Sequence, residues 1–295
     1  MKSTKYGLTS LRKQFPTDES CIEFMFDALH SRKCSCGGTY SLMRNGKNRK
    51  LRTFRCSKCK TKISPTAHTI FNKSDTPLVL WFHALMVFSN AKSGMSAKAL
   101  ERDLEVTYKT AWRILTLIRK ALPQSEEPLT GDVEMDAGYF GGKGNAGKNN
   151  AKLSEVMKKK SVVFAAVQRG GQMRAQIMPD ASAKSHKNFL WQNVSTNSRL
   201  MTDKANRYDK IARGYDRHYV DHHKGEYVRG NVHVNRVESF WAHVKRSIKG
   251  THKVVSQQHL PEYLSGFVWH YNNRGNDRER FYALLGALLQ PVRES

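Results

Sequence analysis

Three acidic residues stand where carboxylates could act together. Asp136 shares one face of an expected strand with Asp132 and Glu134, because apolar and acidic residues alternate along it. Asp203 closes a second apolar run, and α/β sheets tend to place their sites at the C-terminal ends of strands. Glu238 falls at the edge of the apolar stripe of an expected helix. A helix docked on the sheet would hold Glu238 near the strand ends.

Such a group predicts metal-dependent chemistry on phosphodiesters. Carboxylates held together repel one another unless divalent cations neutralise them, and hard oxygen ligands suit magnesium or manganese. Two such ions about 4 Å apart would activate an attacking water or 3′-hydroxyl and stabilise the leaving oxygen. Asn235 and Lys245 lie on the same flank of the helix as Glu238. Any one of these acids alone is more often a solvated or capping residue, so the prediction depends on the combination.

Four cysteines form two pairs, Cys34-Ser-Cys36 and Cys56-Ser-Lys-Cys59. Two turns that each carry two thiolates can supply the four ligands of a structural zinc ion, and a closed four-sulfur site leaves no position for chemistry. The first pair has one intervening residue instead of the usual two, and free thiols are the alternative interpretation. Cys21 is a possible substitute ligand, although its apolar surroundings favour a buried structural cysteine.

The elements that must position these residues fall into successive regions. Residues 20–75 contain the cysteines among short β-type runs and predict a zinc-ribbon domain. Residues 76–122 predict three helices, at 78–90, 96–104 and 108–122, the last two joined as in a helix-turn-helix.

The last of these helices is the candidate DNA-reading helix. Ala111, Leu115, Ile118 and Leu122 form its apolar face, and the opposite face carries Lys109, Arg113, Thr116 and Lys120. Lysine and arginine on such a face can contact phosphates and guanine edges in a major groove. An ordinary amphipathic surface helix is the alternative, so we infer DNA binding by Lys109, Arg113 and Lys120 from the helix together with the ribbon and the basic charge.

Strands and helices alternate in residues 126–275, which predicts one α/β domain, and 276–295 would form a C-terminal helix or tail. The expected strands and helices lie at 133–140, 162–168, 174–178, 185–193, 200–203, 235–250 and 257–272.

The charge of the chain favours a polyanionic partner. The 295 residues include 50 Lys or Arg and 25 Asp or Glu, for a formal net charge of +25. Eleven basic residues and no acid lie between Arg32 and Lys62, which predicts nucleic-acid binding. The longest apolar run is too short to cross a bilayer and no export signal is present, so we expect a cytoplasmic, nucleoid-associated protein with no membrane partner.

As an ordered set, several motifs resemble DDE transposases of bacterial insertion sequences that carry an N-terminal zinc ribbon, the ISXO-type group. The resemblance covers about residues 20–275. Its motifs are Cys56-x-x-Cys59, Ala67-His-Thr-Ile-Phe71, Trp81-Phe82, Gly94-Met-Ser96, Tyr108-Lys-Thr-Ala-Trp112, Val133-Glu-Met-Asp136, Tyr139-Phe-Gly-Gly-Lys143, Thr202-Asp203, Asn235-Arg-Val-Glu-Ser-Phe-Trp241, Lys245-Arg-Ser-Ile-Lys-Gly250 and Tyr271-Asn-Asn-Arg274.

The resemblance implies an RNase H-like catalytic domain, a mixed sheet flanked by helices, that cleaves transposon ends and joins them to target DNA. Asp136, Asp203 and Glu238 would be the catalytic acids, with Lys245 as the basic residue that follows the third. Asn235 is a rival to Glu238, because some members of the group have asparagine as the third catalytic residue. Synapsis of two ends implies a homo-oligomer on DNA, and no small-molecule cofactor is expected.

Two features depart from the pattern of the group and keep other functions open. The family usually has a second acid directly after the first catalytic one, whereas this chain has Ala137, and the first cysteine pair is C-x-C. The alternatives are a zinc-ribbon DNA-binding regulator, which includes a decayed, inactive transposase, and an RNase H-like nuclease that acts on RNA–DNA hybrids or junctions.

Overall fold

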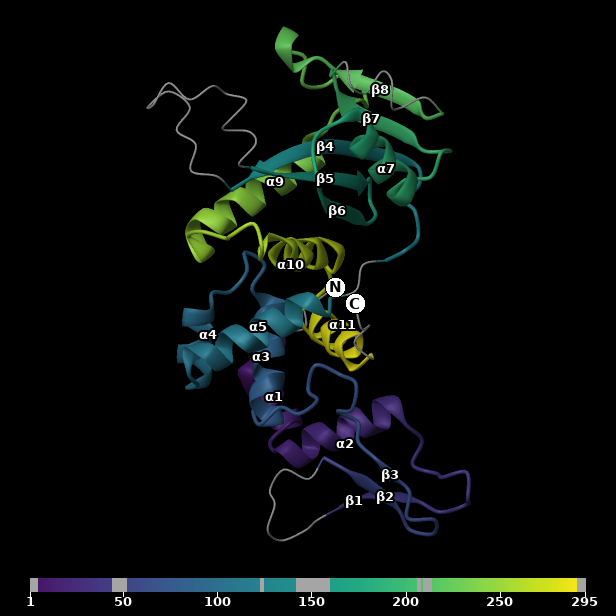
Figure 1. The fold of residues 1–295 in the computed structure, drawn as a ribbon, viewed down its shortest axis with the longest axis vertical. Coiled ribbons are helices and arrows are strands. Elements are labelled where there is room, and N and C mark those ends of the chain that lie inside the picture. Colours follow the sequence, from purple (N-terminus) through teal and green to yellow (C-terminus); the bar gives the residue numbers. More distant parts are fainter. Residues whose placement is uncertain are drawn as a thin grey trace. The chain divides into compact units, whose positions relative to one another are not determined.

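The computed structural model describes residues 5–43, 52–122, 125–141, 160–205, 208 and 214–290 (Figure 1). The chain forms two compact units. The first consists of residues 1–123 together with 273–295, and the second of residues 124–272. Within the described residues, no helix is both long and apolar enough to cross a membrane.

The first unit is built around α3 (Leu78–Asn90), a helix whose side chains are almost all apolar and which is buried on most sides, as such a composition requires. The C-terminal helix packs against it, and the Arg280 Nε donates to the carbonyl of Ser89 at 3.0 Å. The other helices of this unit are α1 (Leu8–Gln14), α2 (Asp18–Leu29), α4 (Ala97–Leu104), α5 (Tyr108–Lys120) and α11 (Asp277–Leu289).

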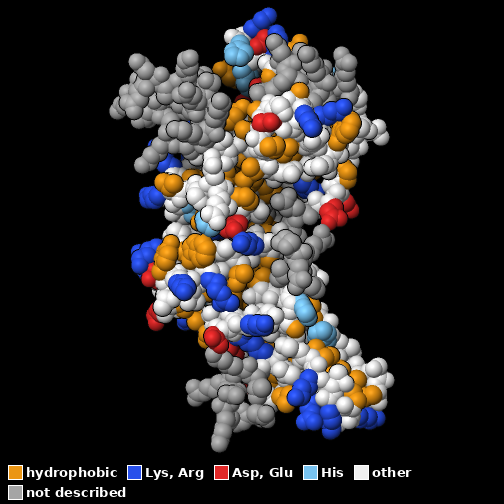
Figure 2. Space-filling view, viewed as in Figure 1, with side chains coloured by type: hydrophobic (Ala, Val, Ile, Leu, Met, Phe, Trp, Pro, Cys, Tyr) orange, Lys and Arg blue, Asp and Glu red, His pale blue; other side chains and the backbone are white. Residues whose placement is uncertain are grey.

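A three-stranded antiparallel sheet completes the first unit. Its strands are β1 (Tyr40–Leu42), β2 (Phe54–Cys56) and β3 (Lys62–Ile63), in that order. Phe26 of α2 stacks on Phe54 with ring centroids 4.0 Å apart, which attaches the small sheet to the helices. Figure 2 shows basic side chains over these strands, where Lys58, Lys60 and Lys62 are exposed.

The second unit contains a five-stranded mixed sheet in the order β6-β5-β4-β7-β8. Its first three strands in sequence pair antiparallel, and the last two run parallel to β4, which is the RNase H-like arrangement. Sequence patterns did not predict β8, an edge strand with mostly polar residues. The strands are β4 (Asp132–Phe140), β5 (Ser161–Gln168), β6 (Met173–Met178), β7 (Arg199–Asp203) and β8 (Asp216–Val220).

Helices cover both faces of this sheet, as the α/β prediction requires (Figure 1). On one face, α7 (Ala183–Asn193) packs with the cluster that includes Val133, Met135 and Phe164. On the other, α9 (Asn235–Ser247) and α10 (Leu260–Asn272) pack with Val163, Ala165 and Val167. The α9 face of β4 is therefore the face that carries its acidic residues.

Candidate active site

The register of the sheet brings Asp136 and Asp203 together. β4 and β7 are parallel neighbours in which Glu134 lies opposite Met201. Continuing this register by two residues places Asp136 opposite Asp203, the last residue of β7. Adjacent strands lie about 4.8 Å apart and laterally paired side chains point to the same face, so both carboxylates lie on the same face of the sheet.

The other two acids on this face of β4 are held by arginines. Both oxygens of Asp132 accept hydrogen bonds from Arg199, at 2.8 and 2.7 Å, and Glu134 accepts one from the Nε of Arg169 at 2.8 Å. Among the described residues, no lysine or arginine forms an ion pair with Asp136. Of the three acids that the sequence pattern placed on one face, Asp136 is therefore the one without a lysine or arginine partner in the described part of the chain.

Glu134 has a separate task, because it fixes the start of α9. Its Oε2 accepts the backbone N–H of Arg236 in the first turn of that helix at 2.8 Å. The Arg169 that pairs with Glu134 also donates to the carbonyls of Asn231 at 2.7 Å and His233 at 3.1 Å. The fully buried carboxylate of Glu134 thus caps the N-terminus of α9 from the neighbouring strand and attaches the helix to the sheet.

Attached in this way, α9 carries Glu238 close enough for its charge to act on Asp136. Burial, together with the negative charges of Asp203 and Glu238, raises the pKa of Asp136 to about 6, although the backbone N–H of Ala137 and the side chain of Trp241 oppose the increase. The Oδ1 of Asp203 is buried and has no hydrogen-bond partner among the described residues. Three mutually repelling carboxylates, one with an unsatisfied buried oxygen, are a donor set that suits divalent cations.

Asn235 and Lys245 lie on either side of Glu238 along α9. Asn235 is the exposed first residue of the helix, and the charge that acts on Asp136 comes from Glu238. Lys245 is exposed two turns beyond Glu238 and lines a cavity. The geometry therefore favours Glu238 over Asn235 as the partner of the two strand carboxylates.

Two residues near this group were not predicted as site residues. The His222 Nδ1 lies 3.7 Å from the Oε1 of Glu238, from a turn that follows the unpredicted strand β8. Trp241 faces Asp136 and also closes over the strand, since a Cβ on Gly138 would lie 3.1 Å from its indole ring. Glycine at 138 lets α9 approach β4 closely. Both residues could be recognised only once the partners of Glu238 and of β4 were known.

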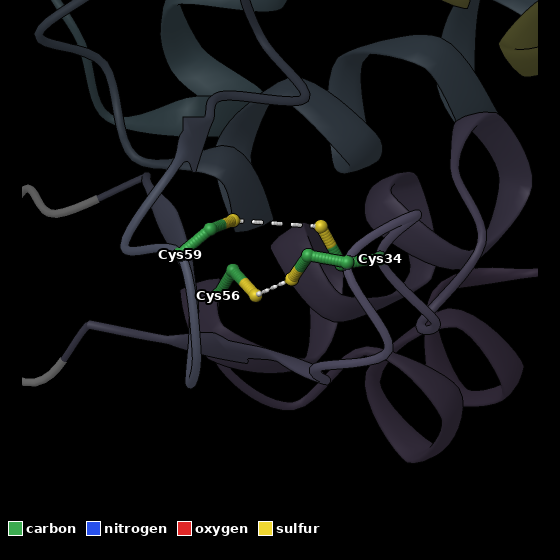
Figure 3. Close-up of side chains that lie close together, drawn as sticks. Cys34, Cys56 and Cys59 are labelled. Atoms are coloured by element: carbon green, nitrogen blue, oxygen red, sulfur yellow. Dashed lines mark hydrogen bonds between the residues drawn. The ribbon is translucent and has the colours of Figure 1, made fainter.

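The four cysteines of the two predicted pairs converge in the first unit (Figure 3). The Sγ atoms of Cys34 and Cys59 are 3.7 Å apart, those of Cys36 and Cys56 are 3.5 Å apart, and all four lie within 4.8 Å of one another. Four sulfurs about 2.3 Å from one tetrahedral zinc would be about 3.8 Å apart. The cluster is therefore close enough to bind one metal ion.

Backbone geometry accounts for the short spacing of the first pair. Gly37 has a positive φ of 77°, and the N–H of Cys34 donates to the carbonyl of Gly38 at 2.9 Å, which closes a tight turn. A Cβ at Gly38 would lie 2.6 Å from the sulfur of Cys56. Cys21 is outside the cluster, fully buried in α2, where burial raises its pKa to about 12.

Helices α4 and α5 form the expected helix-turn-helix, with Glu105 in the left-handed conformation between them. Lys109 and Lys120 are exposed and Arg113 is half-buried. Thr116, expected on the basic face, is instead 8% exposed, because it sits against the core on the wider buried side of the helix. Tyr108 and Trp112 are exposed beside Lys109, an addition that the apolar pattern did not predict.

Comparison with known proteins decides the family. Residues 128–272 match the ISXO2-like transposase domain. A protein of the transposable element ISH50 from Halobacterium salinarum is 30% identical over 240 residues, which cover 77% of this chain and 81% of that protein. The chain belongs to the ISXO2-like transposases.

Solved structures share little sequence with this transposase. A pre-cleavage Mos1 transpososome is 10% identical, with a TM-score of 0.29, and covers 69% of this chain and 74% of that one. A simian T-cell lymphotropic virus intasome is 9% identical, with a TM-score of 0.29 and coverages of 57% and 59%.

The structure of this transposase gives the Ala137 departure a simple meaning. Ala137 follows Asp136 on β4, so its side chain points to the opposite face, where it packs against the cluster of Val133 and Met135. An acid at this position would lie on the α7 side of the sheet, away from Asp203. The substitution therefore removes nothing from the face that carries the carboxylate group.

Proposed function

We propose that this transposase cleaves the ends of its insertion sequence and joins them to target DNA, using Asp136, Asp203 and Glu238 as metal ligands. The observation that carries the proposal is that Asp203 and Glu238, from a parallel strand and a helix, act on Asp136 through their charges, while Asp132 and Glu134 are already held by arginines. Bound there, two magnesium or manganese ions would activate the attacking oxygen and stabilise the leaving one.

The chain's own residues would orient the DNA strand for both steps. Hydrolysis at the element's end and attack by the freed 3′-hydroxyl are both phosphoryl transfers, so one carboxylate group can serve both. Lys245, two turns along α9, would contact a phosphate beside the cleaved bond. We propose Glu238 as the third acid over Asn235, because its charge reaches Asp136.

The first unit would provide the binding to terminal inverted repeats. Lys109, Arg113 and Lys120 of α5 would contact DNA in the manner of a helix-turn-helix, next to the basic ribbon. A zinc ion held by the cysteine cluster would stabilise the ribbon, whose three short strands offer little core of their own. Bringing two ends together calls for at least a dimer on DNA.

Metal-dependent nicking tests the proposal. A supercoiled plasmid that carries the element's end should be nicked with magnesium or manganese, and Asp203→Ala should bind this DNA but leave it intact. Asp216→Asn removes an exposed acid on β8 and is the matched control, so it should cut normally.

Two results would replace the proposal with another function. A wild-type protein that binds the end but never nicks it would be a DNA-binding regulator descended from a transposase. Hydrolysis of RNA–DNA hybrids or junctions without joining to target DNA would indicate a nuclease.

A further inference from the structure

A cavity of about 380 Å³ lies where β4 and α9 end. Its volume is near the lower limit for small-ligand sites, about 300 Å³. Most of its wall is apolar, and the acidic residues described in the structure do not line it. Its lining residues are Tyr139, Phe140, Gly141, Lys245, Ile248, Lys249, Lys253, Val254, Val255 and Leu260.

Three lysines converge on this apolar cavity. Lys245 and Lys249 lie one helical turn apart at the end of α9, which continues as a π-helical turn over Ile248–His252. Lys253 follows with φ 63° and ψ −62°, and the N–H of Val254 donates to the carbonyl of His252 at 2.8 Å. This is a strained γ-turn that a lysine rarely adopts, and it turns the chain back along the cavity.

The cavity lies within a few nucleotides of the carboxylate group. Tyr139 is three residues beyond Asp136 on β4, or about 10 Å at the rise of a strand, and Lys245 is seven residues beyond Glu238, or about 10.5 Å along a helix. The two elements run side by side, since the rings of Phe140 and Trp241 are 5.5 Å apart. At 3.4 Å per nucleotide, about 10 Å corresponds to three nucleotides of a DNA strand.

From this arrangement we propose that the cavity binds one unpaired nucleotide, extruded from the DNA within about three nucleotides of the bond that is cut. Its base would lie against Phe140 and the apolar wall, because aromatic side chains stack on any base. The phosphates on either side would meet Lys249 and Lys253. This inference rests on the proposed function and adds to it a site for a displaced base.

Cross-linking and mismatch binding test the inference directly. The probe is a duplex that joins the element's terminal inverted repeat to its flanking DNA, bound to Asp203→Ala protein so that it stays uncut. With 5-iodouracil placed in turn at the three nucleotides on either side of the element's boundary, one position should cross-link to Phe140. A mismatch opposite that nucleotide should tighten binding by roughly tenfold, because extrusion of a paired base costs a few kcal/mol.

Charge variants show whether the cavity causes the tighter binding of mismatched DNA. Lys253→Glu should abolish both this increase in affinity and the cross-link. Lys184→Glu, an exposed lysine on α7 at the other face of the sheet, should preserve both. Val254 is 81% exposed, so Val254→Asp adds a charge beside the cavity at little risk to folding and should act like Lys253→Glu.

The failure of this inference differs from the failure of the proposed function. The inference would be overturned if the cross-links map to other residues, even if wild-type protein cuts the end. It would also be overturned if the mismatch still increases DNA affinity in Lys253→Glu and Val254→Asp. Loss of nicking with magnesium would overturn the proposed cleavage, while the binding and cross-linking results would still decide the occupant of the cavity.

Discussion

Replacing Asp136 with asparagine should make the metal-free protein more stable at neutral pH while abolishing cleavage. Burial and the charges of Asp203 and Glu238 raise the pKa of Asp136 from 3.8 to about 6. Between these values the folded protein binds a proton that the unfolded chain has lost, so the free energy of unfolding falls as the pH rises. Asparagine mimics the neutral acid and removes this penalty.

The magnitude follows from the shift. At 1.36 kcal/mol per pKa unit, a rise from 3.8 to about 6 corresponds to roughly 3 kcal/mol at pH values above both. For a unit of this size, that is a rise in Tm of about 5–10 °C. The difference between wild type and Asp136→Asn should shrink as the pH falls through 6 and vanish below about 4.

Thermal and urea unfolding in buffers without magnesium or manganese at pH 7.5, 6 and 4 would measure this difference, after a purification that leaves the zinc site loaded. Asp216→Asn removes an exposed acid and should change the free energy of unfolding by less than about 0.5 kcal/mol. Magnesium should then stabilise wild type more than Asp136→Asn. Equal or lower stability of Asp136→Asn at pH 7.5, or equal magnesium stabilisation of both proteins, would refute the reasoning.

Three further outcomes follow from the same structure. Glu134→Gln should lower the free energy of unfolding by about 3 kcal/mol, because it leaves Arg169 with a poorer buried partner. It should also speed hydrogen exchange at the start of α9, and unchanged exchange there would contradict the role of Glu134 in anchoring this helix. Lys109→Ala and Arg113→Ala should each reduce the salt dependence of DNA binding by a slope of about 0.9, measured by titration at several salt concentrations; an unchanged slope would place DNA elsewhere. Cys56→Ser should abolish the bound zinc found by metal analysis and expose the ribbon to limited proteolysis, whereas a protease-resistant ribbon without zinc would show that metal is not needed.

Much of the candidate site follows from local patterns. Alternation along β4 places Asp132, Glu134 and Asp136 on one face, and the apolar run before Asp203 identifies β7. The apolar stripe of α9 puts Glu238 at its edge, and two pairs of cysteines at short spacing identify the ribbon. These are short-range signals, since each depends on residues that are close in sequence and on the period of one element.

Local patterns could not decide which of the acidic side chains already form ion pairs with arginines. Asp132 and Glu134 match Asp136 in type and face, but their arginine partners lie 67 and 35 positions away. The edge strand β8 was missed because apolar and polar residues alternate weakly along it and only its last residue is buried. The burial of Thr116 on α5 likewise depends on how wide a face the neighbouring helices cover.

The sequence by itself determined the types of residue available for metal and DNA, and the elements that carry them. Only the tertiary structure decided that Asp136, Asp203 and Glu238 form one group, since strand register and helix docking are set by contacts between distant segments. The structure also assigned Glu134 to hold α9 and made the position of Ala137 irrelevant to the carboxylate face. Carboxylates of equal chemistry acquire different environments because the fold gives Asp132 and Glu134 an arginine partner and gives Asp136 other carboxylates as neighbours.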